Sequence, residues 1–598
     1  MIAGFCGLVN VKFSSSRFYA ILPTMPAAIE KLWEIKPQLP PEANEQLRQY
    51  HPLLRQILYH RGYITARSAQ EYLEARAPDD NAPENLLGIQ EAKERIWRAI
   101  QKQERIAVYG DYDADGVTAT ALLTDLLRRL GADVRGYIPN RFDEGYGLNI
   151  EALDNLRNDG VRLVVTVDCG ARSLEEAWHA KKIGLDLIIT DHHQPKPQLP
   201  EAIALVNPKQ PGDSYPDKNL AGVGLAYKLA EALLNKASQE GSSAATLLNA
   251  QEYCDLVALG TVSDIAPLIC ENRTFVRQGL QLIRRPSRQG VMSLIGAAQL
   301  NASQITAEHI SFALGPRLNA AGRLDTALDA LNLLLTQEVS EAARLAQRLD
   351  NQNRERQRIT RHIQQKAEAQ AFSRDPQALL LFSADEEFNP GVIGLAAARL
   401  CEQYYRPTIV AHLGEEFTRG SCRSIPEFHI TQALDECADL LVRHGGHAAA
   451  AGFTVHNRDL PELIERLQQI AQSKLSSLDL RPVLSIDAKV ELSELTPELL
   501  IILEQLQPTG YGNPPARFVS TGVRVISSRA VGADASHLKL VVKDGRITYD
   551  AIAFRQGHLQ PNLPLHIDLV FQFERNEYNG RETLQLNVID LRPSRGSG

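Results

Sequence analysis

The stretch from Ile106 to Thr120 limits the possible folds more than any other part of this chain. It begins with a short apolar run that ends at Gly110 and is typical of a β-strand, and a helix is expected to open at about Val117. Between these elements stand three acids at alternate positions: Asp111, Asp113 and Asp115. Like charges this close repel one another unless a cation or a set of hydrogen-bond donors neutralises them. The stretch is therefore either a solvated acidic turn or a cation site.

The chemistry of these acids favours a hard divalent cation. Mg²⁺ and Mn²⁺ prefer oxygen ligands, which carboxylates at a strand end supply. The D-x-D-x-D-G pattern also begins EF-hand calcium loops, but Leu122 stands where such a loop places its Glu, and a strand instead of a helix precedes the acids. The stretch alone leaves a catalytic metal site and a solvated turn both open.

Two further runs of β-forming residues end in titratable side chains. Leu163–Val167 is followed by Asp168, and Asp186–Thr190 is followed by an Asp-His-His sequence at positions 191–193. Helix-length polar segments separate the runs, which predicts β-α-β units and a parallel sheet. Ligands of such sheets bind outside the carboxyl ends of the strands. We therefore expect the acids and histidines to gather at one sheet edge.

A fourth acid, Asp264, follows the apolar segment 256–262 in the sequence G-T-V-S-D, although a single Asp after a strand often only caps a helix. The order D-Y-D-A-D-G, V-D, D-H-H and G-T-V-S-D resembles the DHH phosphoesterase family. Within that family it looks most like the bacterial 5′→3′ exonucleases specific for single strands. The resemblance implies hydrolysis of single-stranded DNA to mononucleotides in DNA repair and recombination, with two divalent ions, Mn²⁺ or Mg²⁺, as cofactors.

The resemblance also implies roles for individual residues. The predicted metal ligands are Asp113, Asp115, Asp168, His192 and Asp264, with Asp111 as a further candidate. Asp168, central in the motif order, is predicted to bridge the two ions, and His193 to contact the scissile phosphate. Asp191 is expected to orient a histidine. Many family members carry a histidine at the position of Tyr109, so one ion has fewer protein ligands here.

Phosphate contacts are expected in three parts of the chain: at Arg141, near position 315 and between positions 419 and 452. Arginine binds phosphate through two N–H groups, and hydroxyls and histidines add further donors. The sequence G-P-R-L-N-A-A-G-R near position 315 and the sequences R-G-S-C-R-S and G-G-H-A-A-A-A-G resemble substrate-facing segments of the family. The predicted substrate-binding residues are Arg141, Arg317, Asn319, Arg323, Ser421, Arg423 and His447.

The expected fold is an α/β multidomain chain. We expect a poorly ordered extension with an alternative start at Met25, a helical lead-in, a parallel-sheet DHH domain, a substrate-facing segment with a long connecting helix, an α/β DHH-associated domain and an OB-like β-barrel. Their expected bounds are 1–25, 26–92, 93–300, 301–377, 378–476 and 481–593. A helix is predicted over 430–442 in the DHH-associated domain. Stacking candidates in the barrel are Phe554, Phe573 and Tyr578.

Composition limits the kinds of ligand and cellular compartment that suit the protein. The net charge of −8 argues against a generally basic surface, so nucleic acid would be bound in a local groove. Seven scattered cysteines without a C-x-x-C pair indicate reduced thiols, and with no run of membrane-spanning length we expect a cytoplasmic protein. The resemblance implies a monomer that acts beside a helicase and a single-strand binding protein. Two alternatives remain: a phosphodiesterase of short oligonucleotides or cyclic dinucleotides, and a non-catalytic nucleic-acid-binding scaffold.

Overall fold

The computed structural model describes residues 30–140, 144–145, 147–532, 534–578 and 581–594. The chain forms two compact units. One comprises 32–360 together with 483–598, and the other is built mainly from 361–482. Among the described residues, none of the helices combines the length and apolar character needed to cross a membrane.

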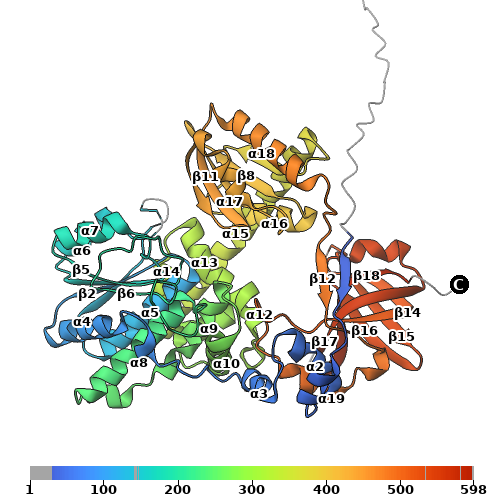
Figure 1. Cartoon of the computed structure of the whole chain (residues 1–598), viewed down its shortest axis with the longest axis horizontal. Helices are drawn as coiled ribbons and strands as arrows, with labels where there is room; N and C mark the ends of the chain where they lie inside the picture. The colour runs from blue at the N-terminus through green and yellow to red at the C-terminus, as the bar shows by residue number, and fades with distance from the viewer. Residues whose placement is uncertain (1–29, 141–143, 146, 533, 579–580, 595–598) are drawn as a thin grey trace, which may run out of the picture. The chain divides into compact units, whose positions relative to one another are not determined.

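The first unit contains a five-stranded parallel sheet with strand order β3-β2-β4-β5-β6 (Figure 1). The strands are β2 Ile106–Gly110, β3 Val134–Tyr137, β4 Leu163–Val167, β5 Asp186–Thr190 and β6 Ala204–Val206. From β2 the chain turns to one side for β3 and then to the other side for β4. The strand order therefore reverses between β2 and β4, and ligands of open parallel sheets bind at this point.

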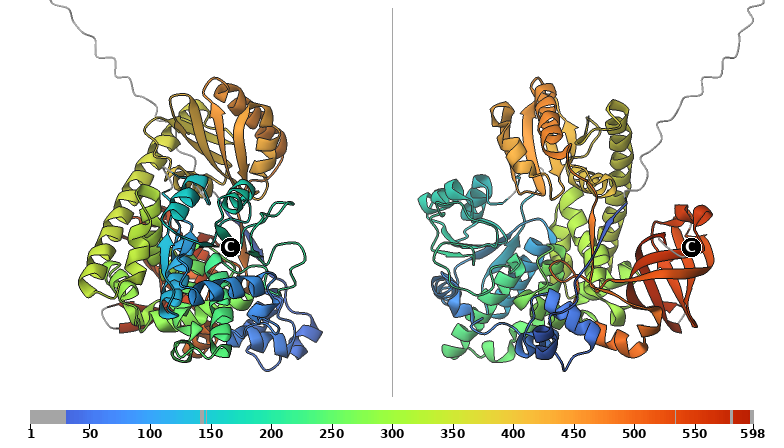
Figure 2. Two further views of the ribbon diagram at one scale, coloured as in Figure 1. Left: turned by 90° about the vertical axis from the view of Figure 1, so that its left-hand side faces the viewer. Right: turned by 45° about the vertical axis from the view of Figure 1, so that its right-hand side comes forward.

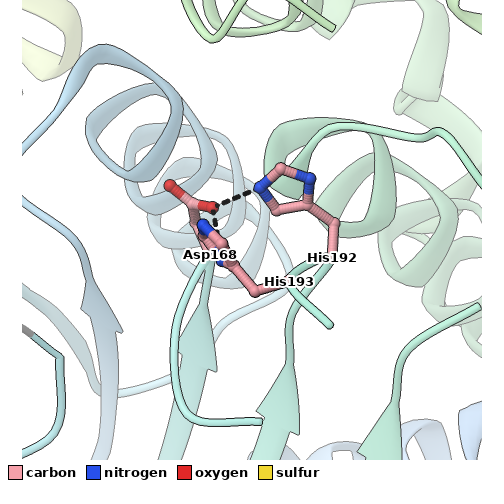
Figure 3. Close-up of side chains that lie close together, drawn as sticks. All are labelled: Asp168, His192 and His193. Carbon is pink, nitrogen blue, oxygen red and sulfur yellow. Dashed lines mark ion pairs between the residues drawn. The ribbon is translucent and has the colours of Figure 1, made fainter. Parts of the chain in front are cut away.

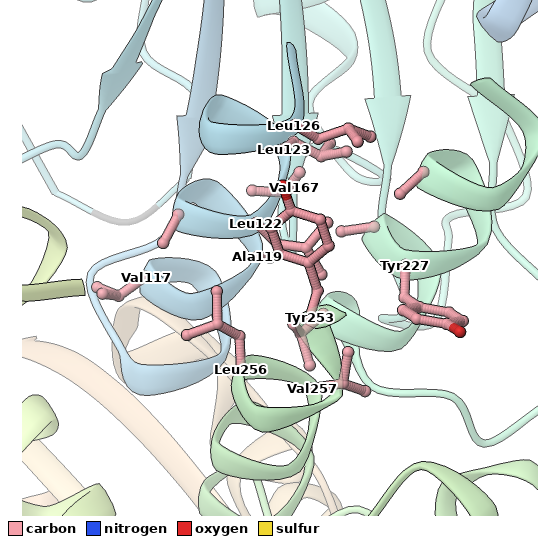
Figure 4. Packing of buried hydrophobic residues seen from close by; sticks show 14 of the residues in the cluster. Val117, Ala119, Leu122, Leu123, Leu126, Val167, Tyr227, Tyr253, Leu256 and Val257 are labelled. Carbon is pink, nitrogen blue, oxygen red and sulfur yellow. The ribbon is translucent and has the colours of Figure 1, made fainter. Parts of the chain in front are cut away.

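Helices cover both faces of this sheet because its side chains alternate between them. Ile106 and Val108 of β2 pack into the larger cluster, while Ala107 and Tyr109 face the smaller one. The helices of the larger cluster include α4 Ile89–Gln101, α5 Ala114–Arg129, α8 Gly222–Gln239 and α9 Cys254–Ser263. Those of the smaller cluster are α6 Ile150–Asn158 and α7 Leu174–Lys182. Figure 4 shows residues of α5, α8 and α9 interdigitating in the larger cluster.

Two expectations about local structure were wrong. Helix α5 begins at Ala114 instead of Val117, because the Asp113 carboxylate accepts the N–H groups of Asp115 and Gly116 and caps the helix. The apolar segment before Asp264 is helix α9 and no strand. Its residues Cys254–Val262 are all buried, so the segment lacks the amphipathic period by which a helix is recognised in a sequence.

The lead-in and the last part of the chain share one core. β1 Leu32–Ile35 pairs in parallel with β12 Val483–Ile486, and three helices follow β1. These are α1 Pro41–Gln46, α2 Pro52–His60 and α3 Ala66–Glu74. Leu54 and Ile57 of α2 pack in the same cluster as Phe518 and Phe571 of the barrel. The lead-in is therefore helical as expected, but it is stabilised by a segment more than 400 residues away in sequence.

The C-terminal barrel is closed. Strand order β14-β15-β16-β18-β17 returns to β14, with only the β16–β18 pair parallel. The strands are β14 Phe518–Val531, β15 His537–Asp544, β16 Ile547–Ala553, β17 His566–Tyr578 and β18 Arg581–Pro593, and α19 Pro497–Glu504 precedes them. Gly545, with φ of 55°, allows the tight β15–β16 turn. This is the expected OB topology. Phe573 is only 6% exposed, which excludes it as a stacking residue, whereas Phe554 is 53% exposed; the Tyr578 side chain lies outside the described residues.

The second unit has the sheet order β10-β11-β9-β8-β7, in which only β7 and β8 are parallel. Its elements are β7 Leu381–Asp385, α16 Ile393–Tyr404, β8 Thr408–Leu413, β9 Phe417–Arg423, α17 Ile430–Asp435, β10 Leu441–Gly446, β11 Ala450–His456 and α18 Leu460–Leu475. The helix predicted over 430–442 ends at Asp435, because Leu441 already pairs with Val455. The glycines at 445 and 446 lie at the end of β10.

Five further helices of the first unit follow α9 in the sequence. They are α10 Cys270–Ile283, α11 Gln289–Ala297, α12 Ala307–His309, α13 Gly315–Leu324 and α14 Leu328–Leu335. Helix α15 Val339–Arg374 then runs unbroken for 36 residues and carries the chain into the second unit (Figure 2). It is the long connecting helix that the sequence predicts between the two lobes.

Candidate metal centre

The carboxyl ends of β2, β4 and β5 meet, as expected, at the reversal of strand order. Asp168 follows β4 directly and is 2% exposed. Its φ of 61° is a left-handed conformation that non-glycine residues rarely adopt and that often marks a functional site. A Cβ on Gly222 would lie 2.6 Å from the Asp168 Cβ, so only glycine allows α8 to approach this carboxylate so closely.

His192 brings three acids from separate elements together. Its Nε2 lies 3.0 Å from an Asp168 carboxylate oxygen. Figure 3 marks this ion pair with a dashed line. The same nitrogen lies 3.8 Å from Asp264 Oδ2 and 3.9 Å from Asp115 Oδ2. One imidazole nitrogen is thus surrounded by carboxylates from the end of β4, the end of α9 and the start of α5. A cation at their centre would have oxygen and nitrogen ligands.

A second group of acids shares Asp168 with the first. Ligand atoms of Asp111, Asp113 and Asp168 all lie within 4.8 Å of one another, and the same limit holds for Asp115, His192 and Asp264 and for Asp168, His192 and His193. Asp168 thus belongs to two of these groups, one with Asp111 and Asp113 and one with the two histidines, and His192 links it to the third group. This arrangement suits a pair of cations that share one ligand.

Backbone N–H groups hold the carboxylate of Asp115, which lies in the first turn of α5. The Asp115 carboxylate accepts the N–H groups of Gly222 at 2.6 Å and Val223 at 2.9 Å, both in the first turn of α8. These donors lie at the positive end of the helix dipole. Asn319 of α13, a predicted substrate contact, instead accepts the Ala114 N–H at 2.8 Å and so positions the acidic loop.

Burial and mutual repulsion shift the pKa values of the clustered residues strongly. Burial first, and then the charge of Asp113, raises the pKa of Asp115 to about 7. Burial together with the charges of Asp115 and Asp113 raises the pKa of Asp264 to about 9, and burial and the neighbouring acids raise the pKa of Asp168 well above its usual range. Burial and His193 lower the pKa of His192 to about 3, so its imidazole is neutral, the form that binds metals.

His193 differs from His192 in both partner and charge. Its Nδ1 lies 2.8 Å from Asp191 Oδ1, while Asp191 Oδ2 accepts the Ala171 N–H. Burial opposes a charge on His193, but the hydrogen bond and the charge of Asp191 outweigh it and raise its pKa to about 9. The Asp191–His193 pair therefore presents a protonated, half-exposed imidazole beside Asp168, whose carboxylate lies 3.9 Å away.

The predicted substrate residues have different surroundings. Arg317 of α13 forms an ion pair with Asp350 at 2.9 Å and donates to Ala313 O, which indicates a structural role. Arg323 lies half-buried at the end of the same helix. Arg141 lies outside the described residues.

In the second unit, Ser421 and Arg423 form a small polar site on β9. Arg423 donates to Ser421 Oγ at 3.2 Å, and burial lowers the pKa of its guanidinium. A Cβ on Gly394, at the start of α16, would lie 2.9 Å from Ser421 Oγ, so this glycine lets the helix start approach both side chains. His447 follows β10 and is held through its backbone by Ala450 O and the Thr431 hydroxyl.

The sequence marks Gly222-Val-Gly224 as a helix start that an anion can approach closely, but it does not identify Asp115 as the acceptor of the Gly222 and Val223 N–H groups, because backbone donors have no side-chain pattern. Lys209 was not predicted at all. Lys209 follows β6 at the same sheet edge, and burial lowers its pKa although Asp191 and Asp264 act in the opposite direction. The short β-forming run Ala204–Val206 before Asn207 was the available signal for this residue.

Family models match three parts of the chain. They describe the DHH family N-terminal domain at residues 105–261, the DHHA1 domain at 377–473 and the RecJ OB domain at 486–590. The chain is 38% identical to the single-stranded-DNA-specific exonuclease RecJ of Bacillus subtilis, covering 93% of this chain and 70% of the relative. The RecJ proteins of Haemophilus influenzae and Escherichia coli are 35% and 36% identical, each over 91% of this chain and 96% of the relative.

Solved structures agree with these relatives. The crystal structure of RecJ from Thermus thermophilus in complex with Mn²⁺ matches with a TM-score of 0.80 and 31% identity, covering 94% of this chain and 80% of the other. The Mg²⁺ complex of the same protein matches with a TM-score of 0.75 and 30% identity.

Proposed function

This chain belongs to the RecJ family of single-stranded-DNA-specific exonucleases, and from this premise we propose that its acid–histidine centre hydrolyses the terminal phosphodiester of single-stranded DNA. The enzyme is a metal-dependent nuclease. The observation that carries this function is the position of Asp168, which groups with Asp111 and Asp113 and also with the two histidines, at the reversal of strand order of the sheet. Direction, products and the role of each residue are part of the proposal.

The residues present suit two divalent cations, Mn²⁺ or Mg²⁺. Among the described residues, Asp168 Oδ1 and His192 Nε2 are buried without a hydrogen-bond partner although they lie 3.0 Å apart. Buried polar atoms of this kind normally have a partner, so both atoms are oriented toward a shared ligand. Asp115, Asp168, His192 and Asp264 would hold one ion, and Asp113, Asp168 and Asp111 the other. Bound there, the ions would lower the pKa of a water molecule and offset charge on the phosphate oxygens.

The chain itself contributes a proton donor and the orientation of the substrate. His193, charged at neutral pH, can donate from Nε2 to an oxygen of the scissile phosphate while Asp191 fixes its other nitrogen. This donor stabilises the negative charge that develops during hydrolysis. Lys209, half-buried near the same acids, adds a second positive charge.

We propose that the second unit recognises the 5′ end. Ser421, Arg423 and the glycine-rich start of α16 offer a hydroxyl, a guanidinium and close backbone approach, which together suit a terminal phosphate. A 5′ phosphate held in this way gives 5′→3′ polarity and release of mononucleotides. The closed barrel adds a surface for the remaining strand, since OB folds bind single strands without sequence preference.

The function is tested with one single-stranded oligonucleotide labelled in turn at each end and incubated with Mn²⁺, Mg²⁺ or EDTA. We expect the 5′ label to be released at once as a mononucleotide and the 3′-labelled strand to shorten stepwise, in metal only. Cleavage confined to dinucleotides would assign the protein to enzymes of short substrates. Binding without metal-dependent cleavage of any substrate would support a scaffold role instead.

We also propose that the enzyme acts as a monomer beside a helicase and a single-strand binding protein. An exonuclease of single strands needs unwound DNA, which a helicase produces, and it meets that DNA covered by binding protein. Light scattering of the purified chain tests the first point, and degradation of duplex DNA with and without a helicase tests the second.

A further inference from the structure

We propose that a positively charged pocket between the lead-in and the barrel binds a phosphodiester group of the substrate strand several nucleotides beyond the metal centre. The proposal rests on the proposed function. The pocket has a volume of about 240 Å³ and lies within the first unit. It is smaller than the sites of roughly 300–1,000 Å³ that enclose drug-sized ligands, and so suits a phosphate group better than a whole nucleoside.

Three parts of the chain form the pocket walls. Lys36 and Arg61 come from the lead-in. Asp487 and Arg517 directly precede the paired strands β13 Ala488–Lys489 and β14, and Ile269 belongs to the loop that connects Asp264 with α10. The loop gives a physical link to the metal centre. Ile269 lies five positions after Asp264, so their Cα atoms lie at most about 18 Å apart, a distance that a few nucleotides of an extended single strand span.

The cations of the pocket are not neutralised by the protein. Among the described residues, no carboxylate oxygen lies within 4.0 Å of a charged nitrogen of Lys36, Arg61 or Arg517. Arg61 donates only to neutral acceptors, namely the Tyr72 hydroxyl, Asn513 Oδ1 and Pro514 O. All three cations are half-buried, so solvent screens them less than fully exposed charges.

The one acid in the pocket is already engaged by backbone. Asp487 Oδ2 accepts the N–H of Arg517 at 2.9 Å, and the Asp487 N–H donates to Arg517 O at 2.8 Å. In the described part of the chain, the buried Arg517 Nε has no hydrogen-bond acceptor. A buried charged donor without an acceptor is unusual in a folded protein, and an anion in the pocket would provide one.

Lys36 is held in place by its backbone while its side chain remains available. Its N–H donates to Ile486 O at 2.9 Å, and the next carbonyl, Pro37 O, is bound by His60 Nε2 at 2.8 Å and Gln56 Nε2 at 2.7 Å. The ammonium group therefore projects from a fixed point of the pocket wall. A fixed cation loses less entropy on binding an anion than one on a mobile segment.

The position of the pocket favours a strand of nucleic acid as its ligand over a free anion. The chain as a whole carries a net charge of −8, so a local group of three cations with one acid is a favourable site for a polyanion. A strand that leaves the metal centre along the Asp264–Ile269 loop reaches this junction before the barrel. A free phosphate ion or a released mononucleotide carries the same phosphate group as the strand. Competition experiments distinguish these three ligands.

The test compares the variants K36A, R517Q and K36A/R517Q with the matched control K102A, which removes an exposed lysine of the same unit. Binding of a labelled thymidine dinucleotide and of a labelled oligothymidylate of about 12 nucleotides is measured by fluorescence anisotropy in EDTA over a range of KCl concentrations. We expect the double variant to bind the longer strand about tenfold more weakly. Its plot of log K against log salt should be less steep by about 0.7, the value for one phosphate contact to a single strand.

The shorter strand separates this proposal from the proposed function. Binding and Mn²⁺-dependent hydrolysis of the dinucleotide should stay at the level of K102A, since its one phosphodiester is held at the metal centre and none is left for the pocket. Equal losses for both lengths, or an unchanged salt slope for the long strand, would overturn the proposal. So would inorganic phosphate or a mononucleotide that competes as strongly as the long strand, because the pocket would then bind a free anion. If R517Q does not fold, K36A alone decides.

Discussion

At the scale of single residues, the position of Asp168 is tightly constrained. It belongs both to a group of acids and to a group with two histidines, is nearly inaccessible to solvent and adopts a left-handed backbone conformation beside Gly222. Replacement by Asn preserves shape and removes the negative charge, so D168N should reduce Mn²⁺-dependent cleavage by at least about a thousandfold, at the upper end of the effect of one preorganised group. End-labelled cleavage assays measure the loss. D159N, which changes an exposed acid paired with Arg135, is the control, and near-normal activity of folded D168N would exclude the bridging role.

The raised acid pKa values give a prediction for stability. The folded protein holds the protons of Asp115 and Asp264 up to about pH 7 and 9, whereas unfolded Asp releases its proton near pH 4. Between these values the folded state binds more protons, so the contribution of these acids to stability falls as pH rises. We expect the Tm of the EDTA-treated protein to fall between pH 6 and 9 and Mn²⁺ to raise it most at the alkaline end. A Mn²⁺ effect that shrinks with increasing pH would contradict the metal assignment.

At the scale of elements, helix α10 fixes two loops next to the metal-centre acids Asp115 and Asp264. Asn272, fully buried, donates from Nδ2 to Asn219 O at 2.7 Å and to Pro267 O at 3.2 Å. The first loop leads to the α8 donors of Asp115, and the second follows Asp264. One amide therefore positions two acids without touching either.

Removal of the Asn272 amide should weaken metal binding while the protein still folds. We expect N272A to bind Mn²⁺ about 10–100-fold more weakly, the usual effect of losing a group that orients metal ligands. Electron paramagnetic resonance of free Mn²⁺ measures the affinity without relying on activity. N332A, which changes an exposed asparagine of α14, is the control. Unchanged Mn²⁺ affinity in folded N272A would show that the loops position themselves.

At the scale of the whole molecule, Arg273 joins three parts of the first unit. Its guanidinium, 1% exposed, donates to Tyr72 O of the lead-in and to four consecutive carbonyls at residues 505–508 before the barrel. It also stacks on the Tyr72 ring at 4.1 Å. Burial lowers the pKa of Arg273, and carbonyl dipoles replace the water that an exposed guanidinium would have.

Loss of this residue should destabilise the junction strongly. In the described part of the chain R273M leaves the Gln505 and Gln507 carbonyls without a donor, and each such group costs about 1–3 kcal/mol, so we expect a loss of at least about 2 kcal/mol. Urea unfolding followed by circular dichroism measures it, with R285A, an exposed arginine of the same region, as the control. A change no larger than that of R285A would mean that the junction is held by its apolar contacts alone.

The sequence by itself determined the parallel sheet, the closed barrel, the long connecting helix and the identity of the clustered acids. These follow from local patterns: β-forming runs, turn residues and acids directly after strands, which the topology of a parallel sheet brings to one edge. It could not determine that 256–262 is a helix or that 441–446 is a strand, because a fully buried helix has no polar face and a short exposed strand has no clear alternation.

Only the tertiary structure decided which groups hold the acids in place. The donors at Gly222 and Val223, the amide of Asn272 and the phosphate-sized pocket at Lys36 and Arg517 join residues far apart in sequence. Backbone donors have no side-chain signature, and a pocket exists only after separate segments have packed. The sequence therefore predicts which types of side chain form the metal centre, whereas the distances between them, their burial and their charge states depend on the fold.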